Sequence, residues 1–228
     1  MGAGDFNPDA FSGRVPLFPL NNVVLFPHAF LPLHIFEPRY RAMTADALGG
    51  EGLIAMAAFE PGWEKDYAGN PPVRSVVGVG KILEHELQAD GRYNLILMGV
   101  ARARIVEEIS LDPYRTARVE LLRERPEKGK KFERLRRLLL LFYNEILKKA
   151  LKGASASPPA DLPLGPLCDL LAAMLAFEPA VKQELLEDLD VGSRCDRLVS
   201  LLESSHAPGF EGASRRRKAP WPPGPSMN

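Results

Sequence analysis

The chain contains few of the residues that build metal sites and disulfide frameworks. It has two cysteines, Cys168 and Cys195, and four histidines among its 228 residues. The sequence contains no CxxC motif, and no Cys/His group has the spacing of a zinc site. Both cysteines lie in segments that we predict to be helical, so we expect buried or half-buried free thiols. The sequence therefore predicts no metal and no cofactor.

The sequence motifs of common catalytic sites are also missing. No GxxxxGK[ST] loop is present to hold the phosphates of ATP, and the nearest match, Gly78 to Lys81, is followed by Ile82 where the hydroxyl residue is required. Neither HExxH nor GxSxG occurs. His34 lies in an apolar run, and we interpret it as a packing residue. We expect a protein that is not an enzyme.

Long hydrophobic runs are absent as well. No segment approaches the roughly 20 apolar residues that are needed to cross a bilayer. The first residues lack the basic and apolar regions of a signal peptide. We therefore expect a cytoplasmic protein.

The balance of charge gives little support to a nucleic-acid interface. Basic and acidic residues each number 29, and the tail after residue 205 has four basic residues against one acidic residue, so its charge is +3 and that of the remainder is −3. A slightly acidic body argues against a broad nucleic-acid surface. The tail predicts at most weak, salt-sensitive contact with nucleic acid through its basic cluster, which consists of Arg215, Arg216, Arg217 and Lys218.

Residues 15–41 form an apolar run that is interrupted by Pro16, Pro19, Pro27 and Pro32. Proline cannot donate to a sheet ladder and is confined to strand ends, edges and bulges, so this run predicts short strands broken at fixed points. The sequence then changes at Glu37-Pro38. Proline suits the first position of a helix, and an acidic residue beside it suits the positive end of the helix dipole. We therefore predict a helix over residues 39–48.

The rest of the chain divides into a β-rich half and a helical half. Apolar or alternating patterns predict strands over residues 52–59, 73–87, 93–98, 101–109 and 115–122, with a bulge or a barrel corner at Gly78 and Gly80. An apolar stripe with helical spacing predicts a long helix over residues 132–150. Three shorter helices are predicted over residues 167–176, 179–188 and 192–204. The fold class is α+β.

Three blocks of the sequence resemble the Lon N-terminal domain, the substrate-binding front end of the ATP-dependent Lon proteases. They are PLFPL…VLFPH…PLHIFEPRYR near the start, VGVGKI…DGRY…LMGVARARI in the middle, and KQELLE near the end. The resemblance covers roughly residues 14–205. It implies a PUA-like β-barrel followed by a C-terminal helical bundle, in a free-standing member without ATPase or peptidase domains.

The expected division follows from the patterns and the resemblance together. Residues 1–13 are predicted to be a flexible arm and residues 14–125 the barrel. Residues 126–205 are predicted to be the helical bundle, and residues 206–228 a disordered basic and proline-rich tail.

Several residues of the Lon-like blocks are expected to serve structure. We predict ion pairs of Glu37, Arg39 and Arg41 that dock the first helix on the barrel. Tyr40 is expected to pack between helix and sheet. Arg102 and Arg104 are expected to project from one strand face, where they either span the surface or pair with nearby acidic residues. The remaining structural positions are Pro19, Pro27, Pro32 and Gly99.

A peptide-binding surface needs exposed apolar or aromatic groups with a few polar anchors. The loop over residues 60–72 carries Trp63 and Tyr67 among polar residues, and it is the first candidate for such a surface. Phe26 and Phe30 flank the turn at Pro27 and are expected to add to an exposed patch. Covering one end of the barrel is the competing role for the loop.

The sequence favours a non-catalytic polypeptide-binding module. Its expected partners are unfolded or degron-bearing polypeptides and a separate ATP-dependent protease, with a role as adaptor or recognition factor in protein quality control. The alternative is an RNA-binding protein, because PUA-like barrels also serve RNA-modifying enzymes. The apolar helix faces leave self-association open.

Overall fold

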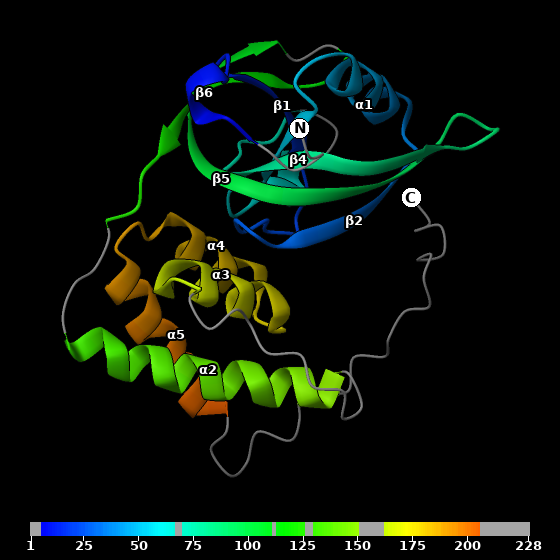
Figure 1. Ribbon diagram of the computed structural model, residues 1–228. Coiled ribbons are helices and arrows are strands. Elements are labelled where there is room, and N and C mark those ends of the chain that lie inside the picture. The colour runs from blue at the N-terminus through cyan, green and yellow to red at the C-terminus, as the bar shows by residue number, and fades with distance from the viewer. Residues whose placement is uncertain (1–5, 67–69, 111–112, 126–129, 151–161, 206–228) are drawn as a thin grey trace.

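The computed structural model describes residues 6–66, 70–110, 113–125, 130–150 and 162–205 (Figure 1). The basic tail from residue 206 lies outside the described residues. The strands are β1 (Arg14–Pro19), β2 (Phe30–Ile35), β3 (Leu53–Ala57), β4 (Val76–Leu87), β5 (Tyr93–Ser110) and β6 (Thr116–Leu122). The helices are α1 (Pro38–Gly49), α2 (Lys130–Ala150), α3 (Leu164–Met174), α4 (Pro179–Glu187) and α5 (Val191–Ser205), with 3₁₀ turns η1 (Pro8–Ala10) and η2 (Trp63–Asp66).

The six strands form one mixed sheet that closes into a barrel. Their order is β2-β5-β4-β3-β1-β6, and β6 also pairs with β5. Closure depends on the length of β5: its first part pairs with β2 and β4, and its second part pairs with β4 and β6. Among the described strands, β2 alone stands outside the ring, attached to β5 on one side.

Two apolar layers follow from the alternation of side chains along these strands. The barrel interior is filled by small and β-branched residues, among them Val15, Ala55, Val79 and Ala103. The outward-facing set joins α1 and the later helices in a second cluster that extends from the barrel to α5. The barrel therefore shares its outer core with the helices.

The helices begin where the sequence patterns predict them, within a few residues. Glu37 is the N-cap of α1 and Pro38 occupies its first turn. Helices α2 to α5 lie below the barrel, where α3 packs against α2, α4 and α5, and α4 reaches β4 (Figure 1). In this part of the structure both cysteines are buried, and neither forms a disulfide.

Residues 6–13 were expected to belong to a flexible arm, and this expectation is wrong for them. Residues Pro8–Ala10 form η1, and the rings of Phe6 and Phe11 pack edge to face with their centroids 5.9 Å apart. Both phenylalanines contact the cluster that fills the barrel. The apolar rings hold this segment down because they bury surface against the barrel.

The prolines occupy positions where a sheet needs no N–H donor. Pro19 ends β1. Leu17 N–H donates to Arg115 O at 2.8 Å, on the side of β6. Because successive residues of a strand direct their N–H groups to opposite sides, the nitrogen of Pro16 points away from β6. Pro32 lies in β2, at the edge of the sheet. Pro27 occupies a turn that is closed by Ala29 N–H donating to Phe26 O, at 3.2 Å. The predicted confinement of proline to strand ends, edges and bulges holds for Pro19 and Pro32, whereas Pro16 lies inside β1, between β3 and β6.

The segment before β2 crosses the sheet in very close contact. A Cβ atom built at Gly78 would overlap the carbonyl oxygen of Leu25, and one built at Gly99 would overlap that of Phe26. Gly80 lies at a register shift between β4 and β5, as the glycine pattern predicted. The glycines therefore make room for another stretch of backbone.

We predict that Gly99→Ala lowers the free energy of unfolding by about 3 kcal/mol. The added methyl group would overlap the carbonyl oxygen of Phe26, so the backbone at Phe26 and the strand β5 would have to move apart. Gly49→Ala is the matched control, since a Cβ atom there meets no other atom within 4 Å. Chemical denaturation measures both variants. Equal stability of the two would contradict the assigned contact.

Candidate functional site

Two large, exposed apolar side chains lie along the free edge of the sheet. Phe30 is 64% exposed at the start of β2, and Phe36 is 55% exposed just after its end. Side chains two residues apart in a strand share one face. We call the surface formed by Phe30, Pro32, His34 and Phe36 the β2 face.

Residues of β5 extend this apolar surface. Met98 is paired with Phe30 and Ile96 with Pro32, and both β5 side chains are half-buried. On the opposite side of β2, Leu33 and Ile35 are buried in the outer core. Because that side is fixed in the core, the β2 face is a rigid apolar surface.

A polar group borders one end of the β2 face. His34 Nδ1 lies 2.7 Å from Asn94 Oδ1, and Asn94 Nδ2 donates to Glu86 Oε2 at 3.3 Å. Arg92 lies beside the other ring nitrogen of His34, at 3.5 Å, and pairs with Asp90 at 2.6 Å. The hydrogen bond from Arg92 holds the pKa of the Asp90 carboxyl below its ordinary value. The surface therefore combines aromatic groups with hydrogen-bonding anchors.

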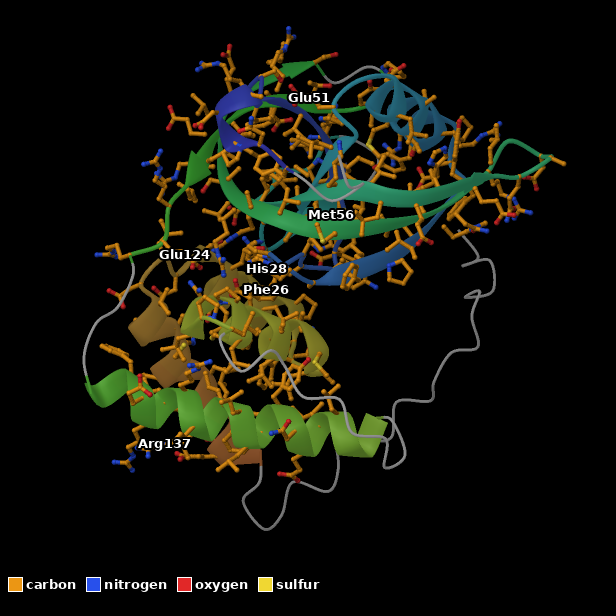
Figure 2. All side chains as sticks on the ribbon, viewed as in Figure 1. Phe26, His28, Glu51, Met56, Glu124 and Arg137 are labelled. Atoms are coloured by element: carbon orange, nitrogen blue, oxygen red, sulfur yellow. The ribbon has the colours of Figure 1, made fainter. Side chains whose placement is uncertain are left out.

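Phe26 does not belong to an exposed patch, and the prediction that it does is wrong. Its side chain is fully buried in the outer core. The turn at Pro27 directs Phe26 inward while His28, in the left-handed region at φ 66°, stays exposed. Figure 2 shows Phe26 and His28 near Glu124, where the barrel meets the helices.

Trp63 is half-buried and forms part of a packed loop. Its ring stacks on Phe59 with centroids 5.0 Å apart and an interplanar angle of 19°. Arg74 anchors the base of this loop, because it pairs with Glu60 at 3.3 Å and with Glu187 of α4 at 2.7 Å. The predicted contact residue Tyr67 lies outside the described residues. The loop connects β3 to β4, whereas the β2 face lies on β2, so the two candidate surfaces come from different parts of the chain.

The expected docking of α1 by ion pairs is wrong for Glu37 and Arg39. Arg39 Nη2 pairs with Glu37 Oε2 at 3.0 Å, so both charges belong to the start of the same helix and both are exposed. Tyr40 packs as predicted, because it is buried and its ring lies 4.4 Å from that of Phe18 in β1. The contact of Tyr40 with Phe18 therefore helps to dock α1, and the ion pair of Glu37 with Arg39 does not.

Arg102 and Arg104 lie two residues apart on β5 but in different environments. Arg104 is exposed, whereas Arg102 is only 2% exposed. Arg102 makes a bidentate pair with Asp169 of α3, at 2.6 and 2.8 Å, and donates to Glu124 at 2.9 Å. The expectation of pairing with nearby acidic residues is confirmed for Arg102, although the main partner is far away in the sequence.

Arg194 of α5 completes this cluster, in which Glu124 is half-buried and the other three side chains are buried. We call it the junction cluster: Arg102, Glu124, Asp169 and Arg194. Arg194 pairs with Glu124 and lies 3.2 Å from Asp169. Burial raises the pKa of the Asp169 carboxyl, and the two guanidiniums oppose that shift. The opposite charges balance, and the cluster joins β5 to α3 and α5.

The described residues contain no group of three or more His, Cys, Asp or Glu side chains that could hold a metal ion. No described helix is both long enough and apolar enough to span a membrane. The described residues form an α+β domain made of a mixed sheet and helices. One edge of its sheet carries exposed apolar side chains.

Comparison with known proteins identifies the family. The model of the ATP-dependent protease La (LON) substrate-binding domain matches residues 14–204. The chain belongs to the family of Lon substrate-binding domains. The match includes neither an ATPase nor a protease domain.

Relatives and solved structures agree with this assignment. The chain is 28% identical over 202 residues to the Lon protease of Desulfosudis oleivorans, and 31% identical over 189 residues to that of Desulfovibrio desulfuricans. These alignments cover 85% and 77% of this chain but 24% and 20% of the relatives, so the chain spans about a quarter of their length or less.

Two solved structures share the fold. The Lon N-terminal domain protein of Xanthomonas campestris has a TM-score of 0.58 at 22% identity, over 82% of this chain and 97% of the other. The N-terminal domain of the Mycobacterium avium complex Lon protease has a TM-score of 0.60 at 21% identity, over 85% and 99%.

We predict that Arg102→Leu lowers the free energy of unfolding by about 3–5 kcal/mol, because it leaves a buried carboxylate without its bidentate partner. Arg104→Leu is the matched control, since that side chain is exposed two residues further along the same strand. Its expected effect is within about 0.5 kcal/mol. Urea denaturation of both variants measures the difference, and a small loss for Arg102→Leu would show that the pair contributes little.

Proposed function

We propose that this chain is a non-catalytic module that binds unfolded or degron-bearing polypeptides and selects them for ATP-dependent proteolysis. Membership of the Lon substrate-binding family supports the proposal. The observation that carries it is the exposure of two phenylalanines on one face of an edge strand, 64% for Phe30 and 55% for Phe36. In a folded client the apolar segments that such a face recognises are buried, so unfolded clients are preferred.

The apolar contact supplies the affinity in this proposal. Burying a large apolar side chain contributes about 1.5–3 kcal/mol. The face also loses little conformational entropy on binding, because Leu33 and Ile35 on the reverse side of β2 are fixed in the core. Two aromatic groups with Ile96 and Met98 beside them can therefore support binding of short apolar segments in the micromolar range.

The polar group at the end of the face supplies selectivity. Arg92, Asp90, Glu86 and His34 form a fixed set of charges and hydrogen bonds beside the apolar surface. Because these polar side chains already bond to one another, we expect the face to favour client segments that place small or polar residues beside His34. Such a border is typical of interfaces, in which a polar rim surrounds an apolar centre.

We propose that the helical part over residues 126–205 acts as a bundle that holds the barrel part over residues 14–125 in one orientation. The shared outer core and the junction cluster support this division of roles. A client that is held on the barrel would then be presented in a fixed direction to the rest of the proteolytic machinery. An adaptor role beside a separate ATP-dependent protease is part of the proposal.

The test is the binding of a fluorescently labelled unfolded polypeptide, such as reduced and carboxymethylated lactalbumin, measured by anisotropy. Phe30→Ala is expected to weaken binding about tenfold, because an exposed aromatic anchor contributes more than 1 kcal/mol. Leu141→Ala is the matched control, since Leu141 on α2 is 67% exposed. Thermal unfolding should be unchanged in both variants.

Trp63→Ala distinguishes the two candidate surfaces. If it weakens binding while Phe30→Ala does not, the client lies on the loop over residues 60–72. If the wild-type chain does not bind unfolded polypeptide at all, or if the purified chain cleaves labelled casein with or without ATP, the proposed function is wrong.

A further inference from the structure

The outer edge of β2 carries backbone groups that point away from the sheet. β2 pairs with β5 along one side, from Phe30 opposite Met98 to Ile35 opposite Tyr93. No other described strand pairs with β2. No described backbone group makes a hydrogen bond to the second side of this strand.

The register shows which groups point outward. Gly99 N–H donates to Ala29 O at 2.9 Å, which makes Ala29 and Gly99 a hydrogen-bonded position of this antiparallel pair. Such positions alternate along a ladder, so Leu31, Leu33 and Ile35 also direct their backbone groups toward β5. The backbone groups of Phe30, Pro32 and His34 therefore point outward.

Proline gives this edge a defined defect. Phe30 and His34 each present an N–H donor and a C=O acceptor, but Pro32 presents only a C=O acceptor. The side chains of the same three residues belong to the β2 face. The edge thus offers a polypeptide both backbone hydrogen bonds and an aromatic surface.

We propose that the free edge of β2 takes up an extended segment of client polypeptide as an added strand. This inference rests on the proposed function and specifies how the client binds. Backbone hydrogen bonds to Phe30, Pro32 and His34 hold the segment irrespective of its sequence, and its side chains next to Phe30 and Phe36 decide its affinity. The preferred client is an unfolded segment in which apolar residues alternate with polar ones.

The defect at Pro32 favours a client over a second copy of this chain. An added client strand loses one hydrogen bond, because one of its carbonyl groups faces the ring of Pro32. Two β2 edges paired with each other would lose two hydrogen bonds, since each copy contributes a proline. An edge blunted in this way resists self-association while still accepting a foreign strand.

The first experiment uses a fluorescein-labelled peptide in which valine alternates with threonine, and two N-methylated forms of it. In one form every valine nitrogen is methylated, and in the other every threonine nitrogen. Only alternate residues of an added strand turn their N–H groups toward β2. We expect the two forms to differ in affinity for the full chain by about tenfold or more, because each net hydrogen bond lost costs up to roughly tenfold.

The outcomes separate the binding mode from the function. If unfolded polypeptide binds but the two methylated forms bind equally, or if the unmodified peptide does not bind, strand addition is overturned and the proposed function stands. If neither polypeptide nor peptide binds, the proposed function itself fails. A wild-type dimer that Phe30→Ala dissociates would assign the edge to a second copy and overturn the proposal.

The second experiment restores the missing donor. Pro32→Val is expected to tighten binding of the unmodified peptide about 2- to 10-fold, because it adds one N–H group to the edge. Pro113→Val is the matched control, an exposed proline between β5 and β6. Circular dichroism checks that both variants keep the fold. Unchanged or weaker binding by a folded Pro32→Val would overturn strand addition, because a purely side-chain contact gains nothing from an added N–H.

Discussion

A stretch of backbone at Leu25 and Phe26 crosses β4 and β5 so closely that only glycine fits beneath it, at Gly78 and Gly99. The same crossing aligns the start of β2, because His28 N–H donates to Gly99 O at 2.8 Å and Gly99 N–H donates to Ala29 O at 2.9 Å. These two bonds set the register of β2 on β5. Which residues of β2 are buried, and which face outward, depends on this crossing.

The junction cluster imposes a second constraint close to this crossing, because Pro27 and His28 line one pocket with Arg102, Glu124 and Asp169. Arg102 leaves the barrel and reaches Asp169 and Glu124, and its Nε donates to Leu186 O at 2.9 Å. A buried ion cluster contributes less to net stability than to the choice of a single arrangement, because any other arrangement leaves charges without partners. The barrel and the helices are thereby held together around one outer core.

Much of the fold could be predicted from local patterns. The helix that opens at Pro38, the strands with alternating residues and the glycines at a register shift depend on backbone preferences that act within a few residues. The continuous strand β5 was harder, because residues 93–98 and 101–109 looked like two strands. They form one strand because the shift near Gly99 changes its direction without breaking its pairing with β4.

The candidate site could be predicted only in part. Phe30 was expected to be exposed and is, but Phe26, four residues away and of the same chemistry, is fully buried. Phe36 was missed, although Phe30, Pro32, His34 and Phe36 recur at the period of one strand face. Both faces of this segment are apolar, so alternation could not show which face is buried.

The sequence by itself determined the α+β class, the family and the positions at which strands and helices begin, because these follow from short-range patterns of apolar residues, proline and glycine. The tertiary structure decided which phenylalanine reaches solvent, which acidic residues meet Arg102, and that β2 stands at an edge. Those outcomes depend on contacts between residues far apart in the sequence, and hydrophobicity and charge at a single position do not specify such partners.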